Sequence, residues 1–90
     1  QEGADIFIQH VYEGHSIKAI ARAHRMSPTT VQKLLNKARF NAAENFLEGT
    51  WSLSKESLHY AKNLSVIEWV AEHSTGEKKK LYEEFLESLN

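Results

Sequence analysis

The side chains best suited to chemistry are amides, hydroxyls and one ammonium group gathered in a short segment. Gln32 and Asn36 are four residues apart, so a helix would place both amides on one face. Each amide can bond to N6 and N7 of an adenine. Lys33 can reach guanine O6 and N7 or a phosphate, and Thr29 and Thr30 can bond a phosphate or touch a thymine methyl group. These five residues are therefore candidates for contacts with base edges in DNA.

Basic and hydroxyl side chains flank this segment and could contact the DNA backbone. Ser16 and Lys18 stand at the expected start of an earlier helix, where free backbone amides favour a phosphate. We expect further phosphate contacts from Arg22, Arg25, Ser27, Lys37 and Arg39. Contacts of this kind weaken as the salt concentration rises.

Helix start signals position these residues. A first helix is expected near 4–13, ending at Gly14, and Ser16 is a good N-cap for a second. Ser27 followed by Pro28 predicts the start of a third helix, because the hydroxyl caps free amides and proline at the first position loses no hydrogen bond. This helix is expected to end near residue 43. Its inner side is formed by Val31, Leu34, Leu35 and Ala38.

A helix-turn-helix requires two short helices that meet at a wide angle across a tight turn. Here Ile20 and the small Ala21 form the contact side of the first helix, and Met26 fills the turn. The runs GHSIKAIAR (14–22) and MSPTTVQKL (26–34) resemble the helix-turn-helix of many bacterial and phage regulators. They are similar to response-regulator output domains and to sigma-factor region 4. The resemblance covers about residues 4–44 and implies that the helix starting at Ser27-Pro28 enters the major groove. Arg25 stands where glycine is frequent, so we expect a strained or rearranged turn.

The second half of the chain predicts further helices after a boundary at 48–54, in which Trp51 and Leu53 are expected as core anchors. Ser54 predicts a helix near 55–62 with Leu58 and Ala61 inward. Two capping boxes, at 65–68 and 74–77, predict a helix near 66–73 and a final helix. The final helix is expected to bury a stripe formed by Leu81, Tyr82, Phe85, Leu86 and Leu89.

A second helix-turn-helix over residues 54–73 is left open by the spacing. The six-residue step from Leu58 to Leu64 repeats the step from Ile20 to Met26, and Ser65 could restart a helix as Ser27 does. The face that would follow is apolar and acidic, which repels phosphate. Core packing or self-association is therefore the favoured interpretation of this segment.

Composition fits one small all-α protein. We expect an N-terminal three-helix helix-turn-helix unit (1–46) followed by two or three C-terminal helices that brace or dimerise it (47–90). The net charge is −1, but residues 1–44 carry six basic and four acidic residues, whereas residues 45–90 carry five basic and eight acidic residues. No cysteine occurs, which fits a cytoplasmic location. No apolar run predicts a membrane span or a signal peptide. Because the chain begins at Gln1, a piece of a longer protein also fits.

Catalysis and metal binding have little support in the sequence. Five histidines occur without an HExxH spacing, so we expect no metal site and no cofactor. His24, at the turn, could instead reach a phosphate. Glu83, Glu84 and Glu87 lie on the expected final helix, and nothing in the sequence predicts a cleft beside them. We therefore do not expect the protein to be an enzyme.

The expected function is sequence-specific regulation of transcription, with double-stranded DNA read by the helix at 28–40 and a homodimer formed through residues 50–90. Two alternatives remain. One is a phage or plasmid DNA packaging or partition component, in which the C-terminal helices build a larger oligomer. The other is a protein-interaction bundle that does not bind DNA.

Overall fold

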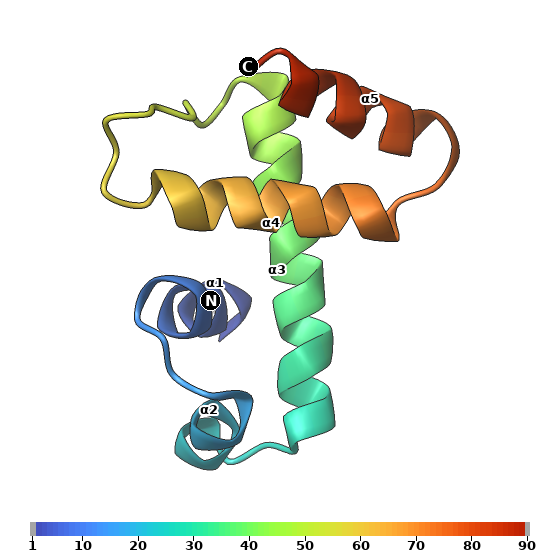
Figure 1. Ribbon diagram of the computed structural model, residues 1–90. Coiled ribbons are helices and arrows are strands. Elements are labelled where there is room, and N and C mark those ends of the chain that lie inside the picture. Colours follow the sequence, from blue (N-terminus) through green and yellow to red (C-terminus); the bar gives the residue numbers. More distant parts are fainter. Residues whose placement is uncertain (1, 90) are drawn as a thin grey trace. The chain divides into compact units, whose positions relative to one another are not determined.

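The computed structural model describes residues 2–89, which form helices and connecting loops, with no β-strand among them. The all-α fold predicted from the sequence is confirmed. The elements follow one another in this order: α1 (Glu2–Phe7), the π-helix η1 (Ile8–Tyr12), α2 (Ile17–His24), α3 (Pro28–Glu48), α4 (Tyr60–His73) and α5 (Gly76–Glu87) (Figure 1). In this part of the chain, no helix is both long enough and apolar enough to cross a lipid bilayer.

The chain divides into two compact units inside α3. The first unit ends at Arg39 and the second begins at Phe40, whereas the sequence predicts a boundary between residues 46 and 47. Because α3 continues to Glu48, the backbone itself has no break at the division. The division instead follows side-chain packing, since Phe40, Ala43 and Phe46 all pack in the second unit.

In the first unit, α1 continues directly into one turn of π-helix. The Glu13 amide donates to the Ile8 carbonyl at 3.0 Å, a bond that spans five residues and therefore widens the turn. Ile6 and Phe7 are buried, and the Phe7 ring meets the Tyr12 ring edge-on at a centroid distance of 5.6 Å. The single α-helix expected near 4–13 is thus an α-helix followed by a π-helix.

The hydroxyls of Ser16 and Ser27 cap the next two helices as predicted. Ser16 Oγ accepts a hydrogen bond from the Ala19 amide at 3.1 Å, and Ser27 Oγ accepts one from the Thr30 amide at 3.1 Å. Figure 1 views α2 almost along its axis and α3 from the side, so α2 and the first turns of α3 run crosswise. Helix α3 ends at Glu48, five residues later than expected.

Two helix ends share one hydrogen-bonding pattern. At the end of α2, the Met26 amide donates to the Ala21 carbonyl at 3.0 Å and the Arg25 amide donates to the Arg22 carbonyl at 3.3 Å. This is a Schellman motif, which places a residue in the left-handed conformation. At the end of α3, Gly49 takes that place with φ +82°, whereas at the end of α2 Arg25 takes it with φ +55°. The strained turn expected at Arg25 is therefore present.

The segment after α3 differs from the expected fourth helix. Residues 55–59 form turns, and Ser54 Oγ bonds the Glu56 amide and carboxylate locally instead of capping a helix. Leu58, expected inward, is 92% exposed. Leu53 packs against the second unit's core as expected, whereas Trp51 is 44% exposed and its ring meets the Phe46 ring edge-on.

Helix α4 is one continuous helix, so the expected helix start at Ser65 is wrong. Ser65 lies in its interior on the exposed side. The buried residues of α4 follow one helical spacing on both sides of Ser65, so the helix continues past this residue. They are Asn63, Val66, Ile67, Val70 and Ala71. A continuous helix leaves no turn between Leu64 and Ser65, and the second helix-turn-helix over 54–73 is therefore excluded.

The final helix forms without its predicted capping box. Thr75 is the N-cap of α5 but makes no side-chain cap bond, and Ser74 Oγ instead donates to the Val70 carbonyl at 2.7 Å. Lys79 Nζ donates to the Ala71 carbonyl at 3.0 Å, so both side chains satisfy the end of α4. Leu81, expected in the inner stripe, is 41% exposed.

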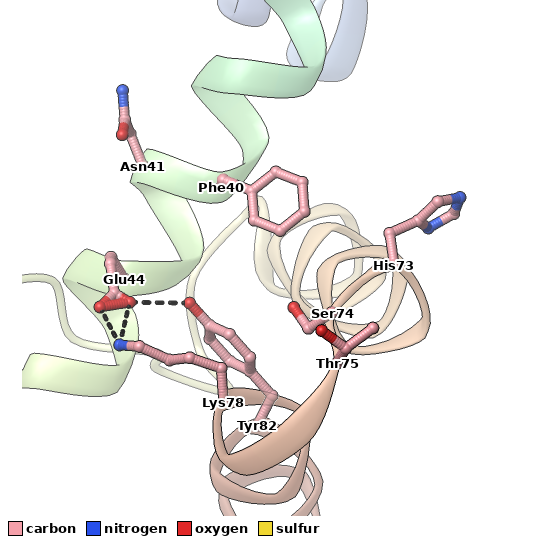
Figure 2. A pocket seen from close by; sticks show the side chains of 8 residues that line it. All are labelled: Phe40, Asn41, Glu44, His73, Ser74, Thr75, Lys78 and Tyr82. Atoms are coloured by element: carbon pink, nitrogen blue, oxygen red, sulfur yellow. Dashed lines mark hydrogen bonds and ion pairs between the residues drawn. The ribbon is translucent and has the colours of Figure 1, made fainter.

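A carboxylate on α3 links this helix to α5. Lys78 Nζ and the Tyr82 hydroxyl both donate to Glu44, the hydroxyl at 2.9 Å (Figure 2). These donors, Lys78 first and Tyr82 second, hold the pKa of Glu44 below its usual value of 4.5. Burial and the bond to Glu44 raise the pKa of Tyr82.

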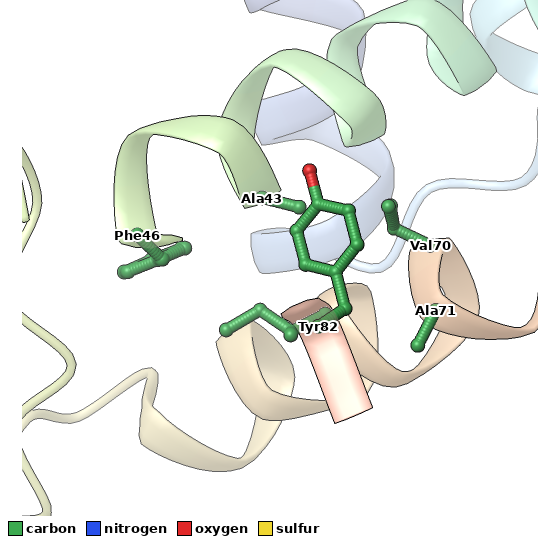
Figure 3. Close-up of a cluster of buried hydrophobic side chains, with 6 residues drawn as sticks. Ala43, Phe46, Val70, Ala71 and Tyr82 are labelled. Atoms are coloured by element: carbon green, nitrogen blue, oxygen red, sulfur yellow. The ribbon is translucent and has the colours of Figure 1, made fainter. Parts of the chain in front are cut away.

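The core of the second unit lies where α3, α4 and α5 meet. Figure 3 shows the Tyr82 ring from α5 beside Ala43 of α3 and Val70 of α4. Half-buried aromatic side chains extend this core, since the Phe40 ring meets the Trp69 ring edge-on at 5.7 Å. The second unit therefore has two helices after α3, within the range that the sequence predicts.

Candidate nucleic-acid interface

The first turns of α3 have a buried side and a polar, largely exposed side. Val31 and Leu35 are fully buried, and Leu34 is half-buried. The candidate base-contact residues are mostly exposed, Asn36 alone being half-buried: Thr29, Thr30, Gln32, Lys33 and Asn36. At about 100° per residue, these five span an arc of about 160° that excludes Val31 and Leu35. One helix surface therefore carries all five candidates.

The two amides on this surface are bonded to each other. Gln32 Nε2 donates to Asn36 Oδ1 at 2.9 Å, and Arg39 Nη1 donates to the same oxygen at 3.2 Å. Burial lowers the pKa of Arg39, whose side chain is half-buried. Arg39, expected to contact a phosphate, thus donates a hydrogen bond within α3, and this chain of amides was not predicted from the sequence. The spacing of Gln32, Asn36 and Arg39 could have indicated it, because side chains three and four residues apart are neighbours on a helix.

The hydroxyls at the start of α3 also bond to one another. Ser27 Oγ and Thr30 Oγ1 are 2.9 Å apart, while Ser27 Oγ also accepts from the Thr30 amide. Thr29 lies between them and is exposed. Ser27 therefore has a structural role as a cap beside its expected phosphate contact, and Thr30 is oriented by the same bond.

The start of α2 combines free amides with a cation. Ser16 Oγ accepts from the Ala19 amide, which leaves its hydroxyl hydrogen available to a phosphate oxygen. The backbone amides at the first positions of a helix have no partner within that helix. Lys18 is exposed in this first turn. These groups match the arrangement expected for a phosphate contact.

The turn between α2 and α3 presents further cations. Arg22 and Arg25 are exposed, and the left-handed backbone at Arg25 directs the chain from α2 into the cap at Ser27. His24, a possible phosphate contact in the sequence analysis, is half-buried and its Nε2 lies 3.0 Å from Gln9 Oε1. It therefore connects α2 to η1.

The charge around this surface has one sign. No aspartate or glutamate occurs between Glu13 and Glu44, whereas six lysines and arginines do. Five of them form no ion pair with a carboxylate in residues 2–89: Lys18, Arg22, Arg25, Lys33 and Lys37. A positive potential therefore extends over α2 and the first turns of α3.

The second unit contains a pocket of about 420 Å³ that was not predicted from the sequence. Phe40, Glu44, His73 and Lys78 are among its lining residues (Figure 2). Glu44 and Lys78 are 34 residues apart, a separation at which local spacing carries no signal. Lys78 and Tyr82 both donate hydrogen bonds to Glu44, so three of the pocket's lining side chains are bonded to one another.

No group of three or more histidine, aspartate or glutamate side chains within residues 2–89 is placed to hold a metal ion. The polar surface of α3 and the cations of α2 therefore stand as the candidate site. Comparison with known proteins adds no relative to this picture: no protein-family model matches the chain, and neither the curated proteins nor the solved structures contain a significant match.

Proposed function

We propose that this protein is a sequence-specific DNA-binding transcriptional regulator that reads the major groove with residues 28–40 of α3. The observation that best supports this proposal is the exposed polar surface of α3 on the side away from the buried Val31 and Leu35. An α-helix fits the width of the major groove, and amide and ammonium groups match the base edges found there. Under this proposal the protein acts in the cytoplasm, where a bacterial or phage regulator meets its operator.

The proposed complex divides its contacts between two helices. The start of α2, with Ser16 and Lys18, meets a phosphate and fixes the register of the protein on the duplex. Gln32 and Lys33 then meet base edges from α3. Each cation that neutralises a phosphate releases counterions, so the affinity falls steeply with salt. This mode of binding explains how a chain of net charge −1 can bind a polyanion, because its cations are concentrated in one unit.

Selection of bound duplexes from a random pool, followed by affinity measurements over a salt series, tests the proposal. Lys37→Ala is expected to make the negative slope of log K against log salt less steep by about 0.9, without changing the preferred sequence. Lys80→Ala is the matched control, since Lys80 is an exposed helical lysine in the second unit. A pool in which no sequence is enriched even at low salt would instead support a protein-interaction bundle.

The double variant Gln32→Ala/Asn36→Ala tests the surface itself. Both side chains lie outside the buried side of α3, so the fold is expected to survive their truncation. Preference at the base pairs that these amides contact should weaken, while salt-dependent binding to any duplex remains. Unchanged affinity and selectivity in this variant would show that Gln32 and Asn36 do not read the DNA sequence.

Self-association through residues 50–90 is the expected partner interaction. Two large apolar side chains exposed in the second unit favour it, those of Trp51 and Leu81. A homodimer would present two reading helices, as palindromic DNA sites require. Light scattering of the whole chain distinguishes the candidates, because a dimer supports the regulator and a ring or larger oligomer supports a packaging or partition component.

A further inference from the structure

The amide chain on α3 has an unambiguous direction. Arginine offers only donors, so the Asn36 atom bonded to Arg39 must be the carbonyl oxygen Oδ1. The Gln32 atom bonded to that same oxygen must then be a donor, which is its amide nitrogen. The chemistry of the three side chains therefore fixes both amide orientations.

The two amides consequently differ in what they can still offer. Asn36 Oδ1 has two lone pairs and accepts two hydrogen bonds, at 2.9 and 3.2 Å, so its acceptor capacity is filled. Gln32 gives one of its two amide hydrogens to Asn36 and keeps the other hydrogen and its own oxygen. A bidentate contact with adenine needs one donor for N7 and one acceptor for N6. Only Gln32 has both available.

Exposure supports the same division. Gln32 is exposed, whereas Asn36 and Arg39 are half-buried. The long Gln32 side chain would otherwise sample many rotamers, and the bond to Asn36 restricts it before any ligand arrives. Restricting a flexible group in the conformation that binds improves affinity, because less side-chain freedom is lost on binding.

From these contacts, and resting on the proposed function, we propose that Gln32 alone reads an adenine and that Asn36, held by Arg39, is the positioning residue that orients it. The ligand feature is thus one A·T base pair in the major groove, contacted through adenine N6 and N7. Asn36 keeps its two amide hydrogens, but these do not select that base pair.

Random duplex selection with the wild-type chain and three variants tests the proposal. Gln32→Ala and Asn36→Ala should weaken the preference for the same single A·T pair, each by about tenfold. The double variant should be no less selective than Gln32→Ala, because the two residues act as one unit. Asn36→Asp keeps the acceptor and removes the amide donors, so it should preserve the preferred sequence while its added negative charge lowers affinity for all duplexes alike.

The outcomes distinguish a failure of the inference about Asn36 from a failure of the proposed DNA-binding function. If the wild-type chain enriches a sequence and Asn36→Ala alters a base pair different from the one altered by Gln32→Ala, Asn36 reads its own base and the inference fails. A shifted preference in Asn36→Asp would have the same meaning. If the wild-type chain enriches no sequence, the proposed function fails as well. Circular dichroism of each variant, with unchanged helix content, confirms that the surface rather than the fold was altered.

Discussion

The turn between α2 and α3 offers a direct test of backbone strain. Arg25 adopts φ +55° and ψ +47°, and it is the one non-glycine residue among 2–89 with a positive φ. A side chain in this conformation costs about 1–2 kcal/mol relative to glycine. Glycine also gains entropy in the unfolded chain, which offsets about 0.4–1 kcal/mol. The free energy of unfolding of the Arg25→Gly variant should therefore be about 1 kcal/mol higher than that of the Arg25→Ala variant.

The comparison of these two variants isolates the backbone, because both remove the same exposed side chain and its charge. Urea unfolding followed by circular dichroism measures the difference, and equal m-values show that the unfolded states are comparable. Gly49→Ala provides the reverse experiment at a matching helix end: a Cβ there meets no atom within 4 Å, so backbone strain alone should destabilise it by about 1 kcal/mol. Equal stabilities of Arg25→Gly and Arg25→Ala would refute this account of the turn.

Three further changes have expected outcomes in the same unfolding assay. Ser27→Ala removes the N-cap of α3 and should cost about 1 kcal/mol. Glu44→Gln should reduce stability at neutral pH and flatten its acid dependence. The pKa of Glu44 is lowered by folding, so its contribution is present above the usual value of 4.5 and is lost as the pH falls through the folded value. Ile67→Ala, at a fully buried position, should cost about 2–5 kcal/mol, whereas Leu58→Ala, at a 92% exposed position, should change stability by less than about 0.5 kcal/mol.

Matched controls make these outcomes specific. Ser52→Ala alters an exposed loop serine and should leave stability within about 0.5 kcal/mol of the wild type. An equal loss in Ser27→Ala and Ser52→Ala would contradict the capping role. For Glu44, acid unfolding of the wild type and the Gln variant along parallel curves would contradict the assigned pKa shift.

Local signals predicted the helix starts where capping chemistry and the following apolar spacing agree. Ser27 followed by Pro28 is such a case, because proline there fits a helix start and Val31 then begins the buried side. Ser65 satisfies the same local pattern and fails. Its neighbours Asn63 and Val66 already lie on one buried side, and this packing keeps the helix continuous through the serine. A capping pattern of four residues does not predict which side of a helix will be buried by the rest of the protein.

The polar surface of α3 was predictable as a surface but not in its internal bonding. Helical spacing alone separates Gln32 from Val31, so the exposure of the candidates follows from the sequence. The choice of Arg39 as a partner of Asn36 depends on rotamers and on the partial burial of Arg39. The π-helix at Ile8–Tyr12 was not predictable from the sequence either, because its residue types would fit an α-helical turn equally well.

The exposed leucine in the loop before α4 has a practical use. These 90 residues contain no cysteine, and Leu58 lies outside the helices with 92% of its surface accessible. Leu58→Cys would thus supply a single thiol for attaching a fluorophore or a spin label. Such a probe would leave the residues of α2 and the first turns of α3 chemically untouched, so rotational diffusion of the labelled chain could be followed as duplex is added.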